Sequence, residues 1–147
     1  MAGFSDYLEK KLLDHVFGGS AYSPPETLYF GLATAAITDS TTGTTVTEPS
    51  GGSYARVAVT NNTTNFPAAT GTTATKKNGT VINFPEATAS WGTVTHFFIA
   101  DAETGGNILA YAALEQVAPD WRPPATIDLN GPPRYSPGTT DGREAAR

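Results

Sequence analysis

Cysteine is absent from the 147 residues of this chain, and methionine occurs only once. The missing thiols exclude disulfide bonds, thiolate nucleophiles and metal sites built on Cys ligands. They do not indicate a cellular compartment, because disulfides are only one way to stabilise a protein outside the cell. A chain of this length is expected to fold as one domain with a core that needs no such cross-links.

Basic residues are few. Nine Lys and Arg stand against 14 Asp and Glu, which gives a net charge of −5 and an isoelectric point near 4.8. Binding along a phosphate backbone requires clustered Lys and Arg, so the composition argues against nucleic acid as a partner. No apolar run approaches the roughly 18–20 residues of a membrane span, and charges throughout the first 19 residues argue against a cleaved secretory signal. We therefore expect a soluble protein with no membrane partner.

Motifs for catalysis and cofactor binding are also missing. Neither a Walker loop, nor Gly-x-Gly-x-x-Gly, nor Gly-x-Ser-x-Gly occurs, which leaves nucleotide binding and serine-based catalysis without support. Paired carboxylates for glycoside hydrolysis are assembled in space, so the sequence leaves that alternative open. The interpretation favoured by the residues is a protein without catalytic residues, metal or cofactor.

The two histidines and one acidic segment are the remaining candidates for a metal site. His15 and His96 have no further His, Asp or Glu at zinc-site spacing, apart from Asp14 beside His15, and are interpreted as structural. Residues 101–107 lack the bidentate Glu that closes a calcium loop, so we interpret them as the tip of a hairpin.

One amphipathic helix is predicted at residues 4–17. Ser5 can cap its first turn, and Gly18-Gly19 is a typical left-handed stop. We expect its apolar stripe to pack on the chain's own β body, because short isolated helices are marginal in water. The alternative is that the stripe forms a contact between subunits. The stripe recurs at intervals of four residues and consists of Phe4, Leu8, Leu12 and Val16.

The rest of the chain has the pattern of strands and turns. Short runs rich in Thr, Val, Tyr and Phe are separated by Gly, Pro, Asn and Ser. The segment 92–114 is predicted to be a β-hairpin, and both faces of its first strand look covered, which favours a central position. Two segments rich in Thr, Gly and Asn, 38–52 and 61–78, are predicted to be long exposed loops. The predicted strands are 27–34, 53–60, 79–84, 92–100 and 107–114, with a further short one at 125–129.

These elements predict a mainly β fold, with an antiparallel β-sandwich or jelly-roll-like domain, one N-terminal α-helix and a Pro-rich C-terminal arm. The predicted organisation is a helix packed on the body at 1–19, a β-sandwich body at 20–118 and the Pro-rich arm at 119–147. The end of the arm beyond residue 137 has no apolar residue except alanine, and it is interpreted as a mobile end or a segment that orders against a neighbour.

Five sequence blocks have a distinctive pattern: 4–9 with 12–15, 24–25 with 28–32, 51–57, 91–97 and 101–109. Together they resemble a family of small virion proteins of tailed phages. The blocks occur in the same order over about residues 4–114, and the chain departs from the family pattern after Leu114. Family members often carry the label "tail fiber protein", and similar proteins are capsid decoration or cement subunits.

The resemblance implies a non-enzymatic structural protein of the virion. The favoured hypothesis is a capsid decoration (cement) protein that binds the outside of the head shell as an oligomer, with the major capsid protein and other copies of itself as partners. A homotrimer is expected, because decoration proteins commonly sit at threefold positions of a shell. The alternatives are a tail or tail-fibre component or receptor-contact module, and an enzyme or carbohydrate-binding domain.

Under the decoration hypothesis the helix and the arm would supply the contacts between subunits or to the shell. A few buried apolar anchors would then provide most of the affinity. The candidate contact residues are Phe4, Leu8, Leu12, Trp121, Arg122, Pro132, Arg134 and Tyr135.

Overall fold

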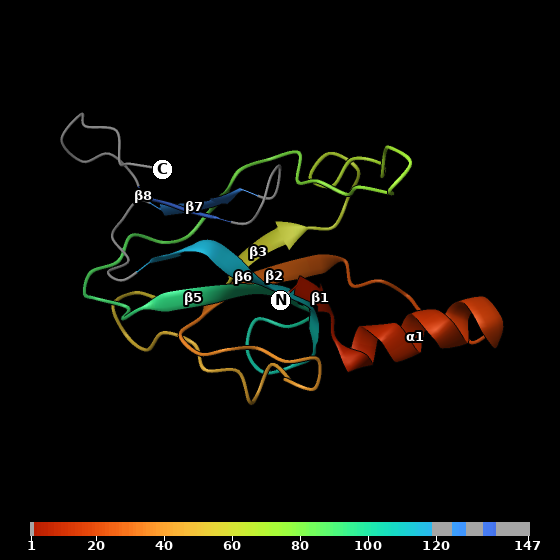
Figure 1. Cartoon of the computed structure of the whole chain (residues 1–147), viewed down its shortest axis with the longest axis horizontal. Helices are drawn as coiled ribbons and strands as arrows, with labels where there is room; N and C mark the ends of the chain where they lie inside the picture. The colour runs from red at the N-terminus through yellow and green to blue at the C-terminus, as the bar shows by residue number, and fades with distance from the viewer. Residues whose placement is uncertain (1, 119–124, 129–133, 138–147) are drawn as a thin grey trace.

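The computed structural model describes residues 2–118, 125–128 and 134–137. It confirms a mainly β, antiparallel fold with one helix (Figure 1). No helix in these described ranges is long and apolar enough to cross a membrane. In chain order the elements are β1 (Ala2–Phe4), α1 (Asp6–Phe17), β2 (Thr27–Ala33), β3 (Val57–Thr60), β4 (Ile82–Asn83), β5 (Val94–Ala100), β6 (Ile108–Ala118), β7 (Ala125–Asp128) and β8 (Arg134–Pro137).

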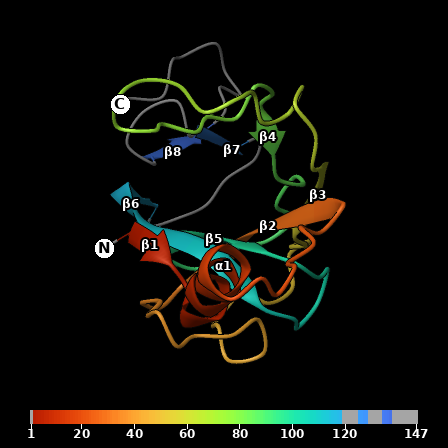
Figure 2. The same ribbon diagram turned by 90° about the vertical axis from the view of Figure 1, so that its right-hand side faces the viewer.

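The strands form two antiparallel sheets. The larger has the order β1-β6-β5-β2-β3, and the smaller has the order β4-β7-β8. The smaller sheet lies across one face of the larger one, as the end-on view in Figure 2 shows, with β8 in contact with β6. The predicted hairpin is confirmed as the β5–β6 pair, and β5 is central as expected. Two segments of the predicted arm, β7 and β8, are strands of the smaller sheet.

Several predicted strands are shorter in the structure, and two strands, β1 and β8, were not predicted. The run 53–60 yields only β3, because Gly51, Gly52 and Ser53 have positive φ angles and Tyr54 N–H closes a turn onto Gly51 C=O. At the other end of the sheet, β1 pairs with β6, placing Phe4 opposite Ala110. Phe4 is therefore the last residue of a strand rather than the first of the helix.

The sequence pattern predicts the wrong face of β5 for Val94. Alternation along 92–100 puts Val94 on the same face as His96 and Phe98. In the structure Val94 packs with Phe97, whereas Phe98 belongs to the opposite face. The register of β5 against β6 shifts between Val94 and His96, and such a bulge moves the residues before it to the other face.

The core has two parts, one on each face of the larger sheet. The part facing the smaller sheet includes Phe30, Phe97 and Trp91, and the part on the opposite face includes Phe98 and Ile108. The two long Thr-rich segments contain no named strand, as predicted, but each contributes a side chain to the core. Phe66 from 61–78 is buried in the first part, and Val46 from 38–52 is partly buried against the second part. The segment 61–78 also closes on itself in an isolated β-bridge between Thr70 and Thr75.

Candidate functional site

Helix α1 is attached to the body at its first turn. The side chain of Ser5 is 1% exposed, accepts a hydrogen bond from Leu8 N–H at 3.3 Å and donates one to Ile108 C=O. Ser5 N–H donates to Leu109 C=O at 3.0 Å, and Asp6 N–H donates to Asp39 C=O at 2.9 Å. Ser5 is thus the predicted N-cap, and it also ties the helix to β6.

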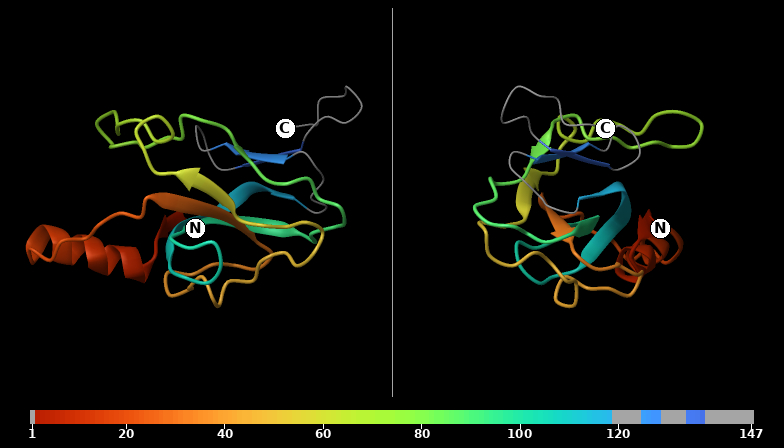
Figure 3. Two further views of the ribbon diagram at one scale, coloured as in Figure 1. Left: turned by 180° about the vertical axis from the view of Figure 1, so that it is seen from behind. Right: turned by 60° about the vertical axis from the view of Figure 1, so that its left-hand side comes forward.

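The rest of α1 extends away from the sheets (Figures 1 and 3). No residue of α1 is buried, although Leu8 and Leu12 are half-buried. Of the predicted apolar stripe, Leu8 and Leu12 are thus half-buried, whereas Phe4 and Val16 are exposed. The last turns are exposed because the hydrogen bonds to β6 lie at the first turn and the helix then runs beyond the edge of the sheet. The most exposed apolar side chains are Leu13 at 57%, Val16 at 65% and Phe17 at 83%.

After α1 the chain turns back alongside the helix. Gly18 N–H and Ser20 N–H both donate to Asp14 C=O, and Tyr22 N–H donates to Nδ1 of His15 at 3.1 Å. His15 therefore has the structural role predicted for it, because it holds the returning segment against the helix.

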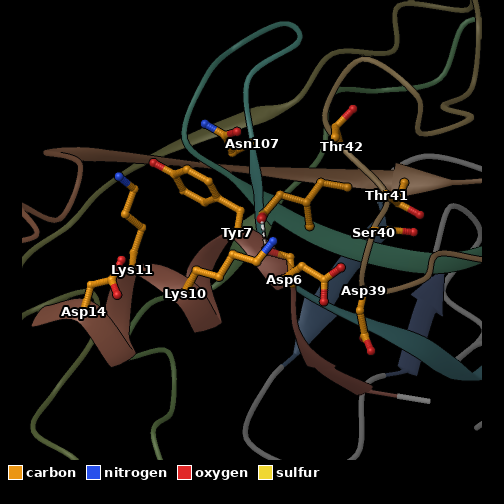
Figure 4. Close-up of a pocket in the computed structure, with 12 residues that line it drawn as sticks. Asp6, Tyr7, Lys10, Lys11, Asp14, Asp39, Ser40, Thr41, Thr42 and Asn107 are labelled. Carbon is orange, nitrogen blue, oxygen red and sulfur yellow. Dashed lines mark hydrogen bonds between the residues drawn. The ribbon is translucent and has the colours of Figure 1, made fainter. Parts of the chain in front are cut away.

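A cavity of about 540 Å³ lies where α1 meets the loop after β2 and the start of β6 (Figure 4). Asp39 is held at its rim by a hydrogen bond from the hydroxyl of Tyr111, and this bond raises the pKa of Tyr111 to about 12. Among the described residues, no group of three or more His, Cys, Asp and Glu could hold a metal ion. The cavity thus offers hydrogen-bonding groups of both charge signs without a metal-ligand cluster. Its lining residues are Ser5, Asp6, Tyr7, Lys10, Lys11, Asp14, Asp39, Ser40, Thr41, Thr42, Asn107 and Ile108.

The loops behind this cavity are held together by Arg56. Its side chain is 2% exposed and forms a bidentate ion pair with Glu48, through Nε to Oε1 at 2.9 Å and Nη2 to Oε2 at 3.0 Å. Its other N–H groups donate to the carbonyls of Ala102, Gly105 and Gly43 at 2.8, 2.9 and 3.0 Å. All five guanidinium N–H groups are therefore used. We refer to Arg56, Glu48 and these three carbonyls as the Arg56 clamp.

The clamp joins two loops to the sheet. The guanidinium of Arg56 lies 5.0 Å from the ring centroid of Phe98, which packs on the cross-strand residue Gly31. Glu48 also accepts a hydrogen bond from the hydroxyl of Tyr54 at 2.8 Å. Burial raises the pKa of Tyr54, so this hydroxyl stays protonated and donates. No sequence pattern singles out Arg56, although it lies within the matching block 51–57.

The hairpin between β5 and β6 has the predicted turn. The carboxylate of Asp101 accepts from Asn107 N–H at 2.7 Å and from its side-chain amide at 2.8 Å. In β5, Nδ1 of His96 lies 2.8 Å from the hydroxyl of Thr95, and burial lowers the pKa of His96. Both features have a structural explanation, as expected.

The predicted contact residues fall into two groups. Phe4, Leu8 and Leu12 lie together on β1 and α1, and Phe4 is 51% exposed. Of the other candidates, two lie in β8, where their backbones pair with β7, and three lie outside the described residues. The two are Arg134 and Tyr135, and the three are Trp121, Arg122 and Pro132.

A known protein family matches most of the chain. The model of the family described as "Podophage GP4 fiber I protein gp80" matches residues 3–119, which include every element from α1 to β6 and the whole Arg56 clamp. No curated protein matches the chain. The match confirms the resemblance to tailed-phage virion proteins seen in the sequence. The chain therefore belongs to the Podophage GP4 fiber I protein gp80 family, a family of phage virion structural proteins.

Proposed function

We propose that this virion protein is a capsid decoration subunit, which binds the outside of the head shell in many copies and stabilises it without enzymatic activity. The observation that carries the proposal is the combination of a rigid β body and a helix that presents apolar side chains to solvent. An exposed apolar surface of this kind is typical of a protein that is covered by neighbours in its working state.

The form of the body supports decoration over a fibre shaft. The described residues fold into two layered sheets with a two-part core, and no repeating unit extends along an axis. The Arg56 clamp fixes the loops at one side of the body, so the surface presented to a neighbour is formed in advance. A preorganised surface loses less conformational entropy on binding.

The proposed partners are the major capsid protein and other copies of the chain, with a homotrimer as the proposed assembly. This assembly follows from the family resemblance and from the threefold positions of a shell. Multi-angle light scattering of the purified protein tests it directly. A mass of three chains supports the trimer, and a mass of one chain contradicts it.

A second candidate function is a tail-fibre component, favoured by the word "fiber" in the description of the family. Immunogold electron microscopy of intact particles distinguishes the two. Decoration predicts gold spread over the head, whereas label confined to the tail would replace decoration by the fibre function. Stripped heads incubated with purified protein provide a second readout, because a decoration subunit should raise the temperature at which the shells open.

A further inference from the structure

The cavity between α1, the loop after β2 and the start of β6 has the size of a binding site for a small molecule. Its volume of about 540 Å³ lies within the roughly 300–1,000 Å³ that is typical of ligand pockets. Neither the decoration function nor the fibre alternative assigns a role to it. We call it the α1 cavity.

The walls of the α1 cavity are joined to one another by hydrogen bonds. Asp6 N–H donates to Asp39 C=O at 2.9 Å, which joins the helix to the loop. The hydroxyl of Tyr111, in β6, holds the side chain of Asp39. On the hairpin side, the carboxylate of Asp101 fixes both the backbone and the side-chain amide of Asn107. The cavity is therefore formed in advance, and a ligand that enters it orders little of the protein.

The charged side chains that α1 contributes to the cavity are without partners. In the described part of the chain, the carboxylates of Asp6 and Asp14 and the ammonium group of Lys10 form no hydrogen bond or ion pair. The ammonium group of Lys11 lies 5.8 Å from the ring centroid of Tyr7, and it takes part in no ion pair there either. Figure 4 shows these side chains around the cavity. Water is their present partner, so a ligand with suitable polar atoms can replace it.

The charges around the α1 cavity nearly balance. An anion such as phosphate would meet three carboxylates, and a cation would meet two ammonium groups. An apolar ligand would take these charges out of water without replacing their hydrogen bonds, which costs free energy. The lining therefore favours a neutral ligand rich in hydrogen-bonding groups. The five charged residues are Asp6, Asp14 and Asp39, with Lys10 and Lys11.

We propose that the α1 cavity binds a neutral saccharide. Each hydroxyl of a pyranose donates one hydrogen bond and accepts others. The carboxylates accept from such hydroxyls and the two lysines donate to them, so one sugar satisfies groups of both charge signs. Hydrogen bonds that involve an ionised partner are also the stronger ones. The C–H face of the sugar is apolar and packs on the half-buried ring of Tyr7.

Two further acceptors in the α1 cavity remain available after their internal hydrogen bonds are counted. The hydroxyl of Tyr111 donates to Oδ1 of Asp39, which leaves Oδ2 for a ligand hydroxyl. The side-chain nitrogen of Asn107 donates to Asp101, which leaves the amide oxygen. A few such bonds in an open cavity give a dissociation constant on the order of 1 mM. Many copies on one particle would strengthen binding to a surface that carries many sugars.

Titration of the ¹⁵N-labelled full chain, followed by NMR, tests the proposal. The probes are the methyl glycosides of glucose, galactose, mannose and N-acetylglucosamine, with inorganic phosphate and glycine as the anionic and zwitterionic comparisons. At least one glycoside is expected to shift the amide signals of Tyr7, Lys10 and Asn107 in a saturable way. No saturable shift with any glycoside up to about 50 mM, or tighter binding of phosphate or glycine at these residues, would overturn the proposal.

A pair of lysine variants separates the cavity from the rest of the surface. Lys10→Met keeps most of the side-chain length and removes the ammonium group, and Lys76→Met makes the same change at an exposed lysine of the loop 61–78. K10M is expected to weaken binding of the best glycoside by about tenfold, because a charged donor is lost. K76M should bind as the unmodified chain does, and equal affinities of the two variants would overturn the proposal.

The saccharide site and the proposed function fail in different experiments. Circular dichroism of K10M checks that the variant is folded, so a loss of sugar binding is then a property of the cavity. Immunogold labelling of particles does not involve the sugar. Gold spread over the head supports decoration whatever the glycosides show, and saturable glycoside binding supports the α1 cavity wherever the gold lies.

Discussion

The Arg56 clamp and the tip of α1 differ strongly in how far their side chains are buried. At the clamp, a buried cation uses all five of its N–H groups to hold the loop 38–52 and the β5–β6 hairpin against the sheet. At the tip, apolar side chains extend into solvent from a helix that is hydrogen-bonded to the sheet at its first turn. The difference separates residues that maintain the fold from residues that are available to a neighbour.

The largest effect is expected at the clamp. Replacing Arg56 by Ala leaves Glu48 without its ion pair and three loop carbonyls without their donor. Removing one partner of a buried pair costs about 3–5 kcal/mol of unfolding free energy. Urea unfolding followed by circular dichroism should show this loss, and Lys76→Ala, at an exposed loop lysine, is the control. A change below about 1 kcal/mol would show that the clamp does not stabilise the fold.

Gly31→Ala tests the contact beneath the clamp. A Cβ atom at this position would lie 2.2 Å from Cζ of Phe98, so the ring or the strand must move. Overpacking of this kind costs about 1–3 kcal/mol. Gly3→Ala is the matched control in β1, because its Cβ would meet only Asp39 at 3.9 Å. Equal melting temperatures of the two variants would contradict the close packing of Phe98 on β2.

Ser5 lies at the point where α1 joins the body, and Ser5→Ala tests this junction. The substitution removes the N-cap of α1 and the donor to Ile108 C=O, with an expected cost of about 0.5–2 kcal/mol. Amide hydrogen exchange should show faster exchange in the first turn of α1 than in β5. Unchanged protection of Leu8 N–H would be inconsistent with a capping role.

Alkaline titration separates buried from exposed tyrosines. The pKa of Tyr111 is raised to about 12, chiefly by its hydrogen bond to the carboxylate of Asp39, and burial raises the pKa of Tyr54. A raised pKa in the folded state means that the stability contributed by the protonated hydroxyl is full below pH 10 and is lost as the pH rises through about 12. Absorbance at 295 nm should therefore show delayed ionisation, and Asp39→Asn should bring Tyr111 closer to its ordinary pKa.

The smallest effect on folding is expected at the tip. Val16→Ser changes a side chain that is 65% exposed, so its free energy of unfolding should stay within about 0.5 kcal/mol of the unmodified chain. Thermal unfolding of dilute protein measures this. A loss comparable to that of the Arg56 variant would mean that the tip is part of the fold, and the contrast between the regions would disappear.

The sequence predicted the elements whose patterns are local. The helix with its Ser5 cap, the β5–β6 hairpin and the central strand are confirmed, because each is encoded in neighbouring residues. The three residues of β1 form a strand only through pairing with β6, and no local pattern marks them. The bulge before His96 likewise arises from pairing between strands, so alternation alone misplaced Val94.

The site depends on contacts that sequence patterns do not record. Arg56 finds its partners 8 to 49 residues away along the chain, and three of them are backbone carbonyls that every residue type carries. The exposure of α1 was not predictable for a related reason. A periodic apolar stripe is the same whether a helix lies on its own body or projects from it, and the attachment of Ser5 decides between the two.

The closed end of the loop 61–78 makes this protein a candidate carrier for foreign peptides. Because Thr70 and Thr75 are already joined by a β-bridge, the chain enters and leaves the end of this loop at neighbouring points. The residues between them are exposed. A peptide inserted there would replace a turn without separating its two stems. On a virion that carries many copies, such an insertion would create a dense display of the peptide for vaccine or affinity use.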